Sequence, residues 1–172
     1  MRLNVLIVGL MLIGALLNIV LNSYVQLGSL KINWILIIML VLTFRHSTHL
    51  IPFLGILAGL ICDALSHGIM GLYAISFFVT LLLARLLNKL FYANTFYTVS
   101  LGVLSMSVFE GWISISILGM LGTEINQSSL VISTVLPLSV LHGLVAPLIL
   151  LGAVWCEKLF SGMFNEVRSS RF

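Results

Sequence analysis

Four side chains of this sequence could hold a proton, an ion or a hydrogen bond within apolar surroundings: Asn18, Asp63, Glu110 and His142. A charged group near the centre of a membrane helix costs about 2.5–3.5 kcal/mol on insertion scales, so such residues face other helices or a water-filled path. Asp, Glu and His form proton relays, but they also fasten helices together through hydrogen bonds. We favour fastening, because a buried carboxyl group can stay protonated and act as a hydrogen-bond donor.

The spacing around Asp63 predicts the direction in which it points. Gly55, Gly59 and Asp63 recur at every fourth position, which places them on one helix face with the Gly-x-x-x-Gly pattern of close helix packing. Similar stripes of small and polar residues are Gly14, Asn18 and Asn22; Ser107, Glu110, Gly111 and Ser114; and Ser139, His142, Gly143 and Ala146. We expect a compact bundle to bring these faces together, so that Asn18, Asp63, Glu110 and His142 satisfy one another by hydrogen bonds.

The stretch from Ser66 to Gly71 predicts a tight turn. Gly68 and Gly71 permit backbone conformations or close helix packing that other residues resist. His67 is therefore expected at a helix end rather than in a set of metal ligands.

Composition indicates an integral membrane protein, since 60% of the 172 residues are hydrophobic and only 8% are charged. A bilayer core needs about 20 helical residues. Apolar runs near that length predict an all-α fold of six transmembrane helices in one compact domain, 1–172, at residues 3–21, 30–44, 50–66, 70–90, 96–121 and 130–159. Continuous apolar runs argue against a barrel, whose strands alternate. Pro137 and Pro147 predict a kink or an interfacial start in the last run.

The basic residues predict the orientation of these six helices. With six crossings, one side of the membrane receives Arg2, Arg45, Arg85, Lys89, Lys158, Arg168 and Arg171. Only Lys31 falls on the other side. Because cytoplasmic loops carry the excess of Lys and Arg, we expect both termini in the cytoplasm.

Several chemistries have no recognisable motif in the sequence. There is no Walker-type phosphate loop, no zinc-protease helix and no nucleophile elbow. Cys62 and Cys156 lack metal-ligand spacing, and the basic residues are too scattered for a nucleic-acid face. We therefore expect no catalytic residues, no metal, no cofactor and no nucleic-acid partner, with lipid as the surrounding medium.

The stretch from Phe44 and Arg45 through Pro52 and on through GILAGLICDALSHGIMGLYAIS resembles the rod shape-determining protein MreD family. The resemblance covers about residues 44 to 85. It includes an arginine expected on the cytoplasmic side and followed by a proline, a helix ending in Gly-Leu-x-x-Asp, and a glycine-containing turn. The matching residues of the helix end and the turn are Gly59, Leu60, Asp63, Gly68 and Gly71.

The resemblance implies a multi-pass protein of the bacterial inner membrane that makes and breaks no bonds. Such a protein is a scaffold of the cell-elongation complex that binds MreC. In a larger assembly with RodA and a class B penicillin-binding protein, it helps couple the MreB cytoskeleton to lateral peptidoglycan synthesis and rod shape. Gly55, Gly59 and Gly71 would permit close helix approach, while Asp63 and Glu110 would fix one bundle.

Two alternatives stay open. The fold of this family is similar to that of the substrate-binding (S) subunits of energy-coupling-factor vitamin transporters, whose pocket would here open outward among Asn18, Asp63, Glu110 and Trp112. A membrane-embedded enzyme would use Asp63, His67 and His142, but these residues lack the spacing of a known catalytic constellation.

Overall fold

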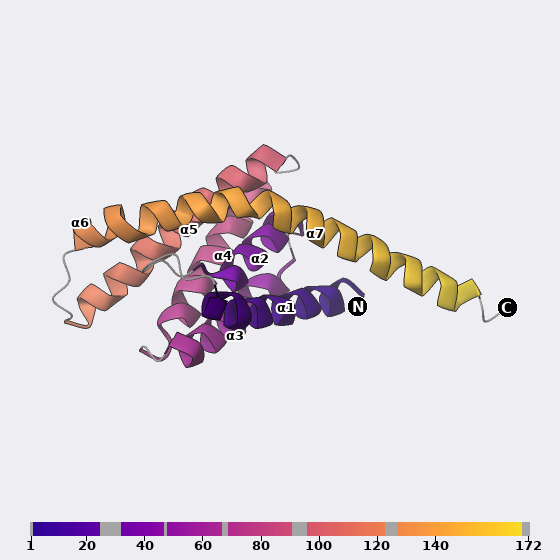
Figure 1. Cartoon of the computed structure of the whole chain (residues 1–172), viewed down its shortest axis with the longest axis horizontal. Coiled ribbons are helices and arrows are strands. Elements are labelled where there is room, and N and C mark those ends of the chain that lie inside the picture. The colour runs from indigo at the N-terminus through magenta and orange to yellow at the C-terminus, as the bar shows by residue number, and fades with distance from the viewer. Residues whose placement is uncertain are drawn as a thin grey trace.

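A computed structural model of the chain describes residues 2–24, 32–46, 48–66, 69–90, 96–122 and 127–169. Within these ranges all regular structure is helical (Figure 1), as α1 (Arg2–Tyr24), α2 (Trp34–Arg45), α3 (Leu50–Ser66), α4 (Leu72–Leu90), α5 (Phe96–Met120), α6 (Gln127–Leu130), the π-helical turn η1 (Val131–Val135) and α7 (Leu136–Ser169). The segments α6, η1 and α7 follow one another without a gap. The prediction of an all-helical chain is therefore confirmed.

Length and composition agree with a membrane protein. Three of the described helical stretches are long and apolar enough to cross a bilayer: Leu72–Lys89, Phe96–Met120 and Val131–Lys158. Three shorter apolar stretches are Ile7–Val20, Trp34–Arg45 and Leu50–Ser66. The six crossings and their orientation stay predictions.

Helix α2 lies at the centre of the bundle. Its residues from Ile35 to Phe44 are all buried, and it packs against α1, α3, α4, α5 and α7. An uninterrupted apolar run is compatible with this position, because a helix that is hydrophobic all round can be buried on every side. The side chain of Asn33 caps its first turn by accepting the Leu36 N–H at 3.3 Å.

Helices α3 and α4 form the closest pair in the bundle. A Cβ atom added at Gly59 would lie 2.4 Å from Ala74 Cα, and one added at Gly55 would lie 2.5 Å from the Leu81 side chain. The two glycines thus let the backbone of α3 approach α4 more closely than larger residues would allow.

Helices α5 and α7 are joined where Pro147 interrupts the hydrogen bonding of α7. Proline has no N–H, so the carbonyl group four residues earlier, that of Gly143, lacks its usual donor within the helix. The Ser100 hydroxyl of α5 donates to this carbonyl oxygen at 2.5 Å. The other predicted irregularity, at Pro137, lies at the second residue of α7, two positions after the end of the π-helical turn η1.

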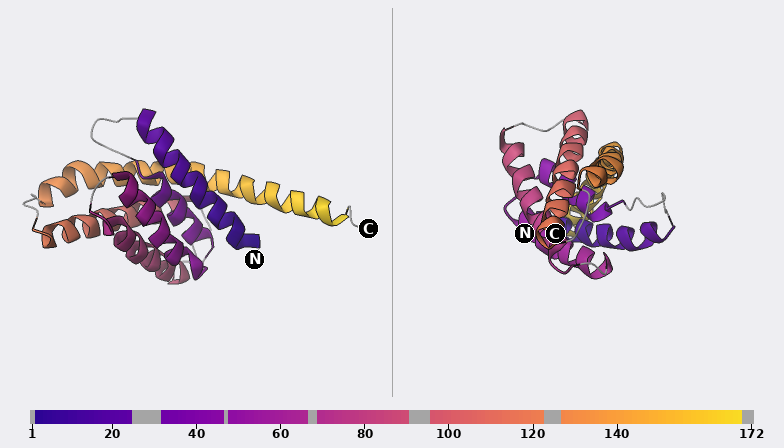
Figure 2. Two further views of the ribbon diagram at one scale, coloured as in Figure 1. Left: turned by 90° about the horizontal axis from the view of Figure 1, so that it is seen from below. Right: turned by 90° about the vertical axis from the view of Figure 1, so that its left-hand side faces the viewer.

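The chain begins and ends toward the same end of the molecule (Figure 1). Helix α7 is the longest element and extends beyond the other helices at that end (Figure 2). Helices α2 and α4 end there and α3 begins there, as their shared contacts near Phe44 and Asn88 indicate. Polar side chains form one layer around Asn33 at the start of α2 and a second layer around Arg45 at its end.

Candidate functional site

Asp63 caps the start of α4 from the end of α3. Its Oδ2 accepts the N–H groups of Gly71 at 2.9 Å and Ala74 at 3.3 Å, and its Oδ1 accepts the Tyr73 N–H at 3.0 Å. The side chain is 2% exposed. A helix N-terminus has free N–H groups and the positive end of the helix dipole, so it suits a carboxylate. Asp63 therefore faces a neighbouring helix, and its partners there are backbone groups.

Gly71 shapes the turn that Asp63 closes. Its φ angle is +95°, in the left-handed region that favours glycine, and its carbonyl oxygen accepts the Ile75 N–H at 3.0 Å. Gly68 and His67, which the sequence placed in the same turn, lie outside the described residues.

Glu110 links α5 to α4 in the interior of the bundle. Its Oε1 accepts hydrogen bonds from the hydroxyl groups of Ser76 at 3.4 Å and Ser114 at 3.0 Å. Ser76 lies on α4, whereas Ser114 lies one turn along α5 from Glu110. The carboxyl group thus has hydroxyl partners on two helices.

His142 joins α7 to α5 and to the start of α2. Its Nε2 accepts the Asn33 N–H at 3.3 Å, and its Nδ1 lies 2.6 Å from the Ser107 hydroxyl oxygen. Because a backbone N–H can only donate, the ring proton belongs on Nδ1, which then donates to Ser107. Both ring nitrogens are occupied, and the residue is 1% exposed.

Asn18 reaches the same layer through a sulfur atom. Its Nδ2 donates to Cys62 Sγ at 3.9 Å, and that thiol donates to Asn33 Oδ1 at 3.8 Å. Asn33 therefore connects α1, α3 and α7 around the start of α2. Sequence reasoning missed this residue, although an Asn directly before a long apolar run is a helix-start signal that could have identified it.

The predicted convergence of four polar residues is wrong in its pairing. Among the side chains that the structure describes, no hydrogen bond joins Asp63, Glu110 and His142 to one another. Each bonds instead to backbone groups or to serines, because these small partners lie on the adjoining helix faces. Trp112, which the vitamin-transporter alternative places at an outward-opening pocket, is 57% exposed on α5.

The second layer contains the described basic side chains. Arg45 makes a two-point ion pair with Glu157 of α7, Nε to Oε1 at 2.8 Å and Nη2 to Oε2 at 2.7 Å, and His46 Nε2 also lies 2.8 Å from Oε1. Asn88 Nδ2 donates to the Thr43 and Phe44 carbonyl oxygens at 3.0 and 2.9 Å and so caps the end of α2. We call this layer the basic end of the bundle.

Within the described ranges, no group of three His, Cys, Asp or Glu residues is arranged to hold a metal ion. Cys62 is buried and Cys156 is exposed, and both are free thiols. Comparisons with protein-family models, curated proteins and solved structures gave no match.

Proposed function

We propose that this chain is a non-catalytic membrane scaffold of the bacterial cell-elongation complex, similar to the MreD family, and that it acts by binding MreC. In that assembly it would help connect the MreB cytoskeleton to RodA and a class B penicillin-binding protein during lateral wall synthesis. Its place would be the inner membrane, with both termini in the cytoplasm.

The observation that carries this proposal is that the buried polar side chains form hydrogen bonds to neighbouring helices of the same chain. The Asp63 carboxylate accepts three N–H groups, one from Gly71 in the turn and two from the start of α4. Glu110 accepts two serine hydroxyl groups, and the ring nitrogens of His142 bond to Ser107 and Asn33. Buried polar side chains that hydrogen-bond to neighbouring helices hold those helices in one arrangement. This supports a binding scaffold over a protein that moves protons or holds a polar substrate.

The side of α7 that faces away from the bundle offers a surface to a partner helix. Exposed apolar residues recur every three or four positions from η1 along this side of α7: Ile132, Leu136, Val140, Leu144, Leu148, Leu151 and Trp155. We call this row the α7 stripe. A single membrane helix of MreC could pack along such a row, because helix association in lipid depends on close surface contact.

Affinity purification of the full chain in mild detergent, with identification of the co-purifying proteins, tests the proposal. We expect wild type to retain MreC. The double substitution Leu144→Asn and Leu148→Asn should remove MreC from the eluate while the chain still accumulates, because polar groups disturb packing in the α7 stripe. The matched control is Leu57→Asn with Leu60→Asn, on an exposed face of α3.

Cell shape supplies the second readout. Cells that depend on Asp63→Leu should round up and lose MreC from the purified complex. Normal rods with intact MreC capture would contradict the proposal. Recovery of energy-coupling transporter proteins, or of a bound small molecule identified by mass spectrometry, would favour the vitamin-transporter alternative instead.

A further inference from the structure

Arg85 is a buried cation without a carboxylate partner in the described part of the chain. It lies on α4 and is only 9% exposed. Its Nε is buried without a hydrogen-bond partner, and its Nη2 lies 3.0 Å from His49 Nε2. A buried guanidinium is costly unless an anion or several acceptors balance it. The buried Arg85 guanidinium, which no described carboxylate balances, therefore indicates a binding site for an anion.

The acidic side chains that the structure describes are engaged elsewhere. Glu157 pairs with Arg45 and His46. Asp63 and Glu110 make their hydrogen bonds in the other layer. The anion that would balance Arg85 therefore has to come from outside this set.

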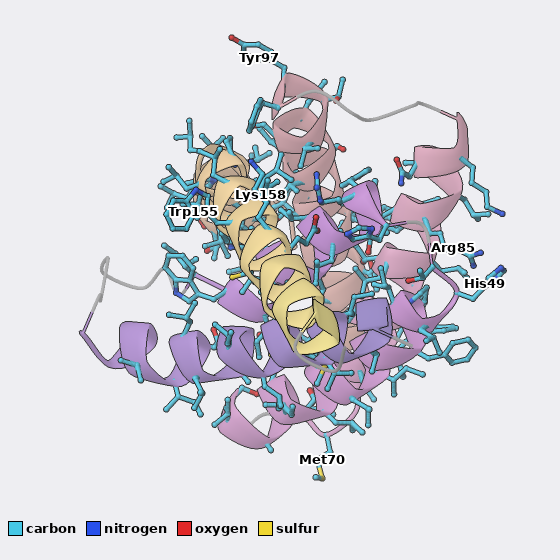
Figure 3. All side chains as sticks on the ribbon, turned by 90° about the vertical axis from the view of Figure 1, so that its right-hand side faces the viewer. His49, Met70, Arg85, Tyr97, Trp155 and Lys158 are labelled. Atoms are coloured by element: carbon cyan, nitrogen blue, oxygen red, sulfur yellow. The ribbon has the colours of Figure 1, made fainter. Side chains whose placement is uncertain are left out.

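The surroundings of Arg85 suit an oxyanion. His49 is exposed and directly precedes α3, and a helix N-terminus carries N–H groups that need an acceptor, here not at Pro52, together with the positive end of the helix dipole. Because a guanidinium group can only donate, His49 Nε2 accepts its hydrogen bond, and the ring proton on Nδ1 is available for donation. Lys89 follows one turn along α4 on the same face and is exposed. Figure 3 shows the ends of Arg85 and His49 together at one edge of the bundle.

We propose that Arg85, His49 and the first turn of α3 bind the phosphate group of an anionic phospholipid, with Lys89 at the rim. The planar guanidinium matches two phosphate oxygens at once. The flanking surface favours a lipid as the source of the phosphate, because Leu50, Phe53 and Leu86 are exposed on α3 and α4 beside the site. Acyl chains would cover these apolar side chains.

Native mass spectrometry of the full chain in mild detergent tests this site. The probes are phosphatidylglycerol, diacylglycerol with the same acyl chains, and inorganic phosphate. We expect phosphatidylglycerol to bind and diacylglycerol not to bind. Arg85→Gln should weaken phosphatidylglycerol binding at least about tenfold, as expected for the loss of a charge-assisted hydrogen bond. Lys158→Gln removes one exposed charge from the basic end and should change the affinity by no more than about threefold.

The remaining variants cover the case in which Arg85→Gln does not fold. His49→Gln changes an exposed residue and should weaken binding several-fold, and Arg85→Lys should do the same because it keeps the charge but loses the planar fork. Unchanged affinity in both variants would overturn the proposal. Equal losses in Arg85→Gln and Lys158→Gln, or equal binding of diacylglycerol, would overturn it as well.

Inorganic phosphate distinguishes the source of the anion. If it displaces phosphatidylglycerol from wild type, the phosphate group alone is sufficient and the site is supported. If it binds through Arg85 while phosphatidylglycerol does not bind at all, the lipid assignment is wrong and the site takes free phosphate.

Discussion

The Asp63 carboxylate acts as the cap of a helix to which it does not belong. A capping side chain usually precedes its helix by one position, whereas Asp63 lies on α3 and accepts three N–H groups at the start of α4. One residue thus connects the end of α3 to the turn and to the start of α4. Its removal would leave several buried donors without an acceptor.

Replacement of Asp63 tests this role. We expect Asp63→Leu to lower the free energy of unfolding by about 2–3 kcal/mol, because buried N–H groups lose their acceptor. Asp63→Asn keeps one side-chain oxygen and should cost about 1 kcal/mol. Titration of the purified protein from mild detergent into sodium dodecyl sulfate, followed by circular dichroism, measures both values. Equal stability of wild type and Asp63→Leu would refute the capping role.

The close packing at Gly59 gives a second prediction about a single residue. A methyl group there would lie 2.4 Å from Ala74 Cα and 2.5 Å from Ala74 N, and backbone atoms cannot move aside cheaply. Gly59→Ala should therefore destabilise the protein by about 1–3 kcal/mol. Gly152→Ala is the control, since nothing lies within 4 Å of the added Cβ, and it should be neutral or stabilising by up to about 1 kcal/mol. The same unfolding titration compares them, and similar effects of both would argue against close packing.

At the scale of a single helix, α7 gives a prediction, because Ser100 of α5 compensates for the N–H group that Pro147 lacks. Because Ser100 supplies the donor that Pro147 lacks, Ser100→Ala should cost about 0.6–1 kcal/mol. In a Pro147→Ala background, the new N–H can bond Gly143 within the helix, so Ser100→Ala should then cost almost nothing. A double-mutant cycle on unfolding free energies measures this coupling. Additive effects would show that the serine does not replace the missing donor.

The elements themselves were largely predictable, because long apolar runs with polar breaks mark the start and end of membrane helices. The expected run at 50–66 coincides with α3, and the run at 96–121 ends one residue beyond α5. The partners of the polar side chains were not predictable. Hydrogen-bonding groups such as the Tyr73 N–H and the Gly143 carbonyl oxygen belong to the backbone and leave no mark in the sequence. The exposed position of Trp112 was also missed, since hydropathy does not distinguish a face toward lipid from one toward another helix.

At the scale of the whole molecule, charge is distributed unevenly. The described basic side chains gather at the end where Arg45 meets Glu157, and Asp63 lies at the opposite end of α3. Because cytoplasmic loops carry the excess of Lys and Arg, we predict that the basic end faces the cytoplasm.

Reporter fusions test this orientation. Green fluorescent protein joined after Phe172 should fluoresce, and alkaline phosphatase inserted after Gly122 should be active, because that enzyme needs the periplasm. Green fluorescent protein after Gly122 and alkaline phosphatase after Phe172 are the reciprocal controls. A reversed pattern would place the basic end outside.

The central position of α2 has a consequence for biosynthesis. Its 12 residues extend about 18 Å, well short of the roughly 30 Å of hydrocarbon in a bilayer. Of the helices that pack against α2, α1 is synthesised before it, whereas α3, α4, α5 and α7, with Glu157, are synthesised later. A nascent chain that stops before α7 would leave one side of this short helix uncovered and Arg45 without Glu157, so such products should be early targets of membrane quality-control proteases.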